Sequence, residues 1–171
     1  MIMNRRYFIA TATLGLPLFG ATVLRGQDTP KPAKPSKLPD ELVKAFVSAG
    51  HNNLPEVQRM LKEQPGLLYA SWDLGGGDFE TALEGAGHVG DREIAEYLIG
   101  QGARANIFVL TMLGHTMMVK TLLTAYPNLL RSKGPHGLTL LHHAQRGGEP
   151  AAELLEHITK LGLTETKLLM P

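Results

Sequence analysis

An internal repeat is the feature that most constrains how this chain can fold. Four segments begin with a glycine followed by His, Asp or a second Gly, and continue with apolar residues at helical i, i+3 and i+4 spacing. They start at Gly50, Gly90, Gly114 and Gly147. Aligned positions 61, 99, 123 and 156 are 38, 24 and 33 residues apart, so the period is irregular. Each segment predicts a helix with one apolar face, which such helices bury by stacking on neighbours.

A second, shorter helix is expected before each of these segments. The expected ranges are 41–48, 81–88, 107–113 and 139–145. Asn52 or Asn53, followed by Pro55, is typical of a helix start. Gly102 and Gly162 mark the ends of two later helices. The repeats therefore predict an all-α fold made of helix pairs.

Two stretches of the repeat resemble the ankyrin family. One has Thr-Ala-Leu-Glu at 81–84 and Gly-Ala-x-x-Asn at 102–106; the other has Gly-Leu-Thr-Leu-Leu-His-His-Ala at 137–144. Ala82 and Leu140 replace the family's proline, and Glu84 replaces its His. The resemblance implies an ankyrin-like solenoid of about four helix-turn-helix repeats over residues 40–163, with divergent first and third units. The positions assigned to the repeat motif are Thr81, Thr139, His142, Gly90 and Gly114.

The adjacent histidines at 142 and 143 could serve a metal, acid–base chemistry or the fold. Neighbouring residues on a helix point about 100° apart, so these two are poorly placed to share one metal. In the ankyrin resemblance His142 has a structural role, with its imidazole hydrogen-bonded to backbone, and His115 has a similar explanation in its Gly-His step. We therefore expect no metal and no cofactor. A metal site formed across units with His136 or His115 is the alternative.

Composition and missing motifs argue against several function classes. The formal net charge is +1, without the basic excess of a nucleic-acid binder. The chain has no cysteine, which excludes disulfides, thiolate nucleophiles and Cys-based metal sites. It also lacks the Gly-x-Ser-x-Gly, His-Glu-x-x-His and phosphate-loop patterns. Gly75–Gly77 is interpreted as a flexible loop. We therefore predict a protein that is not an enzyme.

The first 39 residues predict an export signal followed by a tether. Residues 1–26 have a basic start and an apolar run, as in a signal peptide, and Arg5, Arg6 and Phe8 resemble a twin-arginine export motif. An uncleaved membrane anchor is the alternative, but a spanning helix needs about 20 apolar residues. Residues 27–39 form a Pro/Lys-rich linker, and 164–171 a C-terminal tail or cap. The expected location is periplasmic or otherwise exported, with no membrane span after signal removal.

These observations predict an exported protein–protein interaction module, a scaffold or accessory factor for an unidentified protein of the cell envelope. Aromatic and arginine side chains in the loops are the usual interface anchors. The candidate partner-binding residues are Trp72, Asp73, Phe79, Arg104, Lys133 and His136. Trp72 could instead fill the space between the first and second units, and Phe108 is expected in the core.

Two other functions stay open. One is a small metal-binding or metal-dependent hydrolytic protein that uses clustered histidines, with His88, His115, His136 and His142 as candidates. The other is self-association through the apolar C-terminal segment, and the sequence leaves the oligomeric state undetermined.

Overall fold

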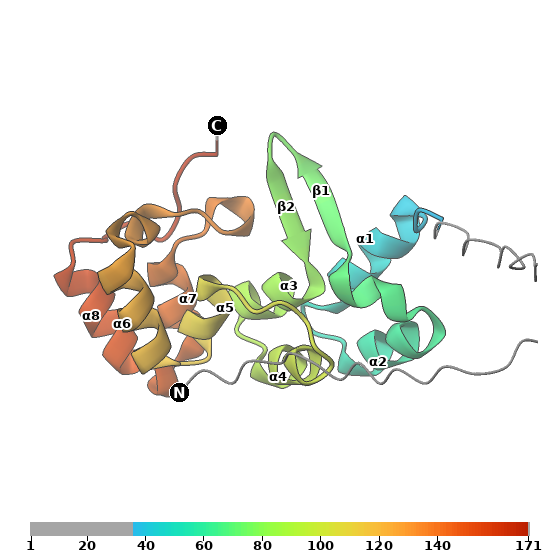
Figure 1. Cartoon of the computed structure of the whole chain (residues 1–171), viewed down its shortest axis with the longest axis horizontal. Helices are drawn as coiled ribbons and strands as arrows, with labels where there is room; N and C mark the ends of the chain where they lie inside the picture. The colour runs from blue at the N-terminus through green and yellow to red at the C-terminus, as the bar shows by residue number, and fades with distance from the viewer. Residues whose placement is uncertain (1–35, 171) are drawn as a thin grey trace, which may run out of the picture. The chain divides into compact units, whose positions relative to one another are not determined.

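The computed structural model describes residues 36–170 of the chain. The predicted signal peptide and export motif, and the linker up to residue 35, lie outside the described residues. Within 36–170 the fold is mainly helical, with a single two-stranded sheet (Figure 1). The prediction of a mainly helical fold is therefore confirmed.

The helices follow one another in four pairs. Their bounds are α1 (Asp40–Ala49) and α2 (Leu54–Glu63), α3 (Ala82–Val89) and α4 (Arg92–Gly100), α5 (Ile107–Met112) and α6 (Thr116–Ala125), and α7 (Leu140–Gly147) and α8 (Ala152–Lys160). All four of the shorter helices expected from the sequence are present, with ends within two residues of the expected ones. The 3.6-residue apolar period thus located both members of each pair.

Side-chain caps explain why several of these helices begin where they do. Asn53 accepts a hydrogen bond from the backbone N–H of Glu56 at the start of α2. Thr81 and Glu84 form a reciprocal capping box at the start of α3. Asn106 accepts from two backbone N–H groups at the start of α5. These bonds satisfy donors that a helix start otherwise leaves without partners.

The first helices of the pairs pack side by side. α3 contacts α1, α5 and α7, and α5 also contacts α7. Buried apolar side chains form two clusters, one centred on α1–α4 and one on α5–α8. Helix α5 belongs to both, because Val109 and Met112 lie in the first cluster while Ile107 and Phe108 lie in the second. Phe108 is a core residue, as expected.

A β-hairpin separates the first helix pair from the second. Strand β1 (Ser71–Gly75) pairs antiparallel with β2 (Asp78–Thr81), with Trp72 opposite Glu80, and the hairpin stands out from the helices (Figure 1). The sequence predicted a flexible loop at Gly75–Gly77. The three glycines instead form the hairpin's tip, where each has a positive φ of 61–92° that glycine adopts without steric cost.

Short 3₁₀ helices complete the fold. η1 (Pro65–Tyr69) and η2 (Pro127–Arg131) follow α2 and α6, η3 (Pro135–Gly137) precedes α7, and η4 (Glu149–Ala151) leads into α8.

The C-terminal segment lies against η3 and the start of α7. The backbone N–H of Thr139 donates to the carbonyl of Thr166 at 3.0 Å, and that of Leu168 donates to the carbonyl of Gly137 at 2.8 Å. Leu163 is completely buried. These two hydrogen bonds join the segment after Leu163 to η3 and to the residue before α7.

We predict that Gly114→Ala destabilises the protein by about 2–4 kcal/mol. Gly114 has φ +74°, and a Cβ there would lie 2.1 Å from the carbonyl oxygen of Pro150. Gly100→Ala is the matched control, because nothing lies within 4 Å of its Cβ position at the end of α4. Urea unfolding of both variants measures the difference, and equal stabilities would contradict the close approach of the two turns.

Candidate functional site

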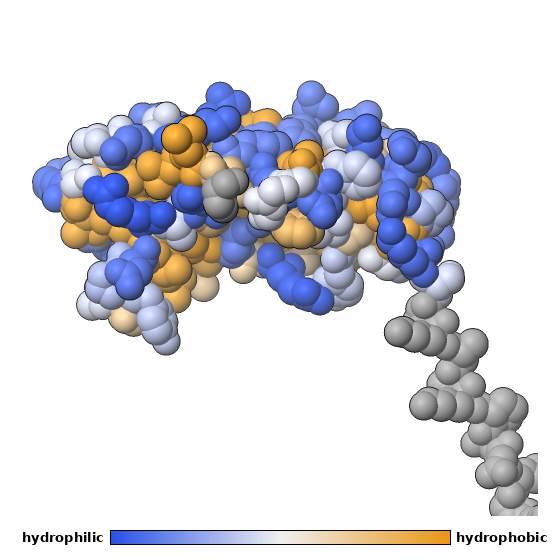
Figure 2. Space-filling model, turned by 90° about the horizontal axis from the view of Figure 1, so that it is seen from above, coloured by the Kyte–Doolittle hydropathy of each residue, from blue (hydrophilic) through white to orange (hydrophobic). Residues whose placement is uncertain are grey.

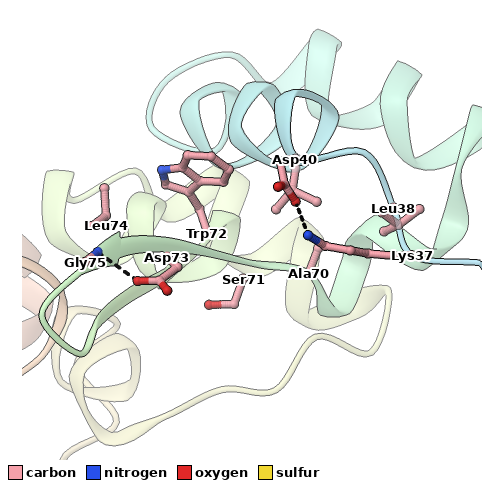
Figure 3. A pocket seen from close by; sticks show the side chains of 10 residues that line it. Lys37, Leu38, Asp40, Ala70, Ser71, Trp72, Asp73, Leu74 and Gly75 are labelled. Atoms are coloured by element: carbon pink, nitrogen blue, oxygen red, sulfur yellow. Dashed lines mark hydrogen bonds and ion pairs between the residues drawn. The ribbon is translucent and has the colours of Figure 1, made fainter.

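A groove runs between strand β1 and the start of α1 (Figure 3). Its volume is about 720 Å³. Its lining residues are Lys37, Leu38, Asp40, Val43, Ala70, Ser71, Trp72, Asp73, Leu74 and Gly75. Lys37 and Asp40 form an ion pair at 2.7 Å on one side, and β1 forms the opposite wall. The lining of the groove thus combines apolar side chains with a charged pair.

Trp72 is the largest side chain in this groove. It is half-buried and packs against the apolar cluster of α1–α4. The ammonium nitrogen of Lys44 lies 5.8 Å from its ring centroid, within range of a cation–π interaction. Trp72 therefore packs against the apolar cluster of α1–α4 and also lines the groove.

Four of the other predicted partner-binding residues fall in three places, and the fifth, His136, lies beside Glu80. Asp73 shares the groove with Trp72, and its carboxylate accepts a hydrogen bond from the N–H of Gly75. Phe79 and Lys133 line a second, smaller hollow beside the C-terminal segment. Arg104 lies apart from both, with its guanidinium carbon 5.1 Å from the Tyr69 ring centroid. The structure does not bring the six residues into one continuous patch.

Apolar side chains are nevertheless exposed on the hairpin. Leu74 is 43% exposed and Phe79 52% exposed. Seen from above Figure 1, the surface has apolar patches among hydrophilic side chains (Figure 2). The hairpin therefore presents apolar surface to solvent on both of its strands.

The repeat-motif residues make structural contacts. Thr81 caps α3, Thr139 donates its hydroxyl to the carbonyl of Glu165, and Gly90 and Gly114 have positive φ. The Nε2 of His142 donates to the carbonyl of His88 at 2.8 Å, which links α7 to the end of α3. This is a contact of the imidazole with backbone, as the ankyrin resemblance implies for that position.

A cluster of histidines surrounds the carboxylate of Glu80. Glu80 is 3% exposed, and its Oε1 lies 2.7 Å from Nε2 of His88, 3.4 Å from Nε2 of His136 and 3.6 Å from Nε2 of His51. The Nε2 atoms of His51 and His88 are 3.0 Å apart. These residues come from the turn after α1, from β2, from α3 and from η3. Four elements thus converge on one carboxylate oxygen.

Neighbouring groups fix the orientation of two of these imidazoles. The Nδ1 of His51 donates to the carbonyl of Val47 at 3.0 Å. The ring of His51 lies against Gly85, where an added Cβ would be 2.9 Å from it. Asp78 accepts two bonds from the backbone N–H of His136, at 3.0 and 3.1 Å, and lies 3.5 Å from its Nδ1. In both imidazoles Nδ1 faces an oxygen while Nε2 faces Glu80.

The electrostatics of the cluster favour an ionised Glu80. Burial is the largest single effect on its pKa and acts to raise it. The hydrogen bond from His88 and the electrostatic interactions with His51, His88 and His136 together outweigh burial and hold the pKa of Glu80 below its usual value. Three imidazole nitrogens around a carboxylate can share protons or bind a cation.

The sequence identified half of this cluster. Of the histidines proposed for a metal site, His88 and His136 come together, whereas His115 is exposed at the start of α6 and His142 bonds to backbone. His51 and Glu80 were missed. The spacing of Asp78 and Glu80 could have indicated that Glu80 belongs to the site, because residues i and i+2 of a strand share a face. The spacing is informative only in a strand, and a loop was predicted next to these residues.

No protein-family model, curated protein or solved structure matches this chain.

We predict that the free energy of unfolding falls less below pH 6.5 in the His143→Leu variant than in the wild type. Burial lowers the pKa of His143 from its usual 6.5 to about 4, against a hydrogen bond from its Nδ1 to the carbonyl of Thr139. The unfolded chain then binds a proton between pH 6.5 and 4 that the folded chain does not, so stability falls as the pH falls through this window, by on the order of 3 kcal/mol.

Urea unfolding between pH 7.5 and 4 measures this effect. The carbonyl of Thr139 also accepts the backbone N–H of His143, so leucine leaves it partnered. The exposed His115, changed to Leu, is the control. Parallel pH profiles for wild type and His143→Leu would show that His143 does not titrate as described.

Proposed function

We propose that residues 40–163 form an ankyrin-like repeat module that binds a protein of the cell envelope as a scaffold or accessory factor. The four helix pairs and the roles of Thr81 and His142 support the repeat assignment. The observation that carries the proposal is the groove beside β1. Its proposed occupant is an extended segment of the partner.

The chemistry of the groove suits such a segment. Within residues 36–170, β1 pairs with β2 alone, so the edge of β1 opposite β2 has no strand partner. An extended peptide can add to such an edge through main-chain hydrogen bonds, while side-chain pockets supply specificity. Trp72 and Leu74 offer apolar surface, and Lys37 and Asp40 offer charged groups of both signs. This combination favours a peptide with alternating apolar and polar residues.

The proposed location is the periplasm or another exported compartment. The basic start, the apolar run and the paired arginines of residues 1–26 support it. None of the helices in residues 36–170 is long and apolar enough to cross a bilayer. The proposed role is binding rather than catalysis.

Because Trp72 is the single tryptophan of the chain, its fluorescence reports on the groove. We predict that peptides selected from a random library against the purified protein shift its emission on binding. Leu74→Asp places a charge in the groove wall and is expected to weaken binding about tenfold or more. The shift gives the dissociation constant directly.

Met117→Asp is the matched control, since Met117 is 82% exposed on α6 and outside the groove. Both variants should keep the circular dichroism of the wild type. Peptides that bind without changing the emission, or that bind Leu74→Asp and wild type equally, would refute the groove as the binding site.

Changing Arg5 and Arg6 together to Lys tests the proposed export route. We expect the double variant to stay in the cytoplasm, because the resemblance assigns recognition to the paired guanidinium groups rather than to charge alone. Arg25→Lys, which keeps the pair, is the control. Cell fractionation followed by immunoblotting measures the exported fraction, and unchanged export of the double variant would indicate a different route.

A further inference from the structure

We propose that His51, Glu80 and His88, with His136 as a fourth ligand, bind a divalent transition-metal ion, with Zn²⁺ as the best fit. This site is separate from the groove and goes beyond the proposed binding of a protein. It differs from the expectation of no metal, which rested on helix spacing at His142 and His143 and on the structural role of His142 in the ankyrin resemblance.

The donor atoms have the separations that such an ion needs. In a tetrahedral site with bonds of about 2.0–2.1 Å, neighbouring donor atoms lie about 3.3 Å apart. The three distances among Oε1 of Glu80 and the Nε2 atoms of His51 and His88 are 2.7, 3.0 and 3.6 Å. Nε2 of His136 is 3.4 Å from the same Oε1. The donors of His51, Glu80 and His88 are thus spaced like corners of a small coordination polyhedron, and His136 approaches them on the side of Glu80.

The tautomer of His51 suits coordination. A carbonyl oxygen can only accept, so Nδ1 of His51 carries the proton that bonds to Val47. In the neutral ring the lone pair is then on Nε2, which faces Glu80 and His88. Metal-bound histidines characteristically donate their second nitrogen to a carbonyl or carboxylate in this way.

At His136 a carboxylate, rather than a carbonyl, lies on the Nδ1 side of the ring. Asp78 lies 3.5 Å from its Nδ1, while its Nε2 is directed to Glu80. Its backbone has φ +60°, the one positive φ of a non-glycine residue among residues 36–170. Left-handed backbone costs such a residue about 1–2 kcal/mol, and the two bonds from its N–H to Asp78 hold it there. The result is an imidazole placed at the cluster by a strained turn.

The side chains of the cluster offer fewer hydrogen-bond donors than acceptors to one another. Nε2 of His88 contacts both Oε1 of Glu80 and Nε2 of His51. One proton on His88 can be shared with these two acceptors, but the lone pair of His51 and the carboxylate then face each other with a single donor between them. A bound cation would satisfy all of these donor atoms at once, after His88 releases that proton.

The donor set selects the class of metal. Three imidazoles and a carboxylate suit Zn²⁺ and the neighbouring transition metals, whereas Ca²⁺ and Mg²⁺ prefer shells of oxygen. The side chain of Glu80 is 4% exposed and that of His88 13%, while those of His51 and His136 are 26% and 35% exposed. The cluster is therefore buried on the Glu80 side and open to solvent beside His136, which gives an ion a way in.

The test is metal titration of the untagged protein after dialysis against a chelator. Isothermal titration with Zn²⁺ should give one equivalent of bound metal, and Co²⁺ bound at the same place should show the intense visible absorption of a tetrahedral site. Glu80→Gln and His88→Ala are expected to weaken Zn²⁺ binding about 100-fold or more. His115→Ala, which changes an exposed histidine outside the cluster, should bind as wild type does.

Two further variants keep the result interpretable if removing a buried group unfolds the protein. His136→Ala changes the most exposed of the ligands, and Gly85→Ala alters only the place of the His51 ring. Both should fold and bind Zn²⁺ more weakly. Absence of a stoichiometric site for Zn²⁺ and Co²⁺ in the folded wild type would overturn the proposal. Binding that survives Glu80→Gln and His88→Ala but is lost in His115→Ala would overturn it equally.

Discussion

The buried carboxylate of Glu80 is the interaction on which the arrangement around the hairpin depends. A charge removed from water is costly unless other groups compensate it, and here the compensation comes from imidazoles on three other elements. The turn after α1, helix α3 and η3 are therefore held at defined distances from β2. Asp78 adds a second link from the same strand to η3. The hairpin is thus held along β2 by these charged contacts, and it exposes Leu74 and Phe79 to solvent.

The helical layers obey a different constraint, which is close approach of backbone at glycines. At Gly50 and Gly147 a Cβ would lie 2.2–2.5 Å from a carbonyl oxygen of the neighbouring unit. Because the pairs stack so closely, α5 can serve two apolar clusters although it is only six residues long. A division of the chain between any two helix pairs would therefore divide at least one of the two apolar clusters. The array is thus expected to unfold as one cooperative unit.

Local patterns were sufficient for the helices and insufficient for the cluster. The apolar period and the caps at Asn53 and Thr81 act within a few residues, so a linear reading found them. The hairpin was missed because Gly75–Gly77 resembles a loop and the strands around it are short. His51 and Glu80 were missed because they meet only after the hairpin and the helix pairs are assembled. Spacing within one helix, which argued against a metal at His142, carries no information about such long-range convergence.

The register of the hairpin gives the molecule a mechanical property. Trp72 and Glu80 are direct cross-strand partners, so the residue that lines the groove and the residue at the centre of the histidine cluster lie on one face of the same two-stranded ribbon. A displacement of β1 is transmitted to Glu80 across a single rung of the ladder. If binding in the groove changes the affinity of the histidine cluster for its ligand, binding at the cluster must change the affinity of the groove by the same factor.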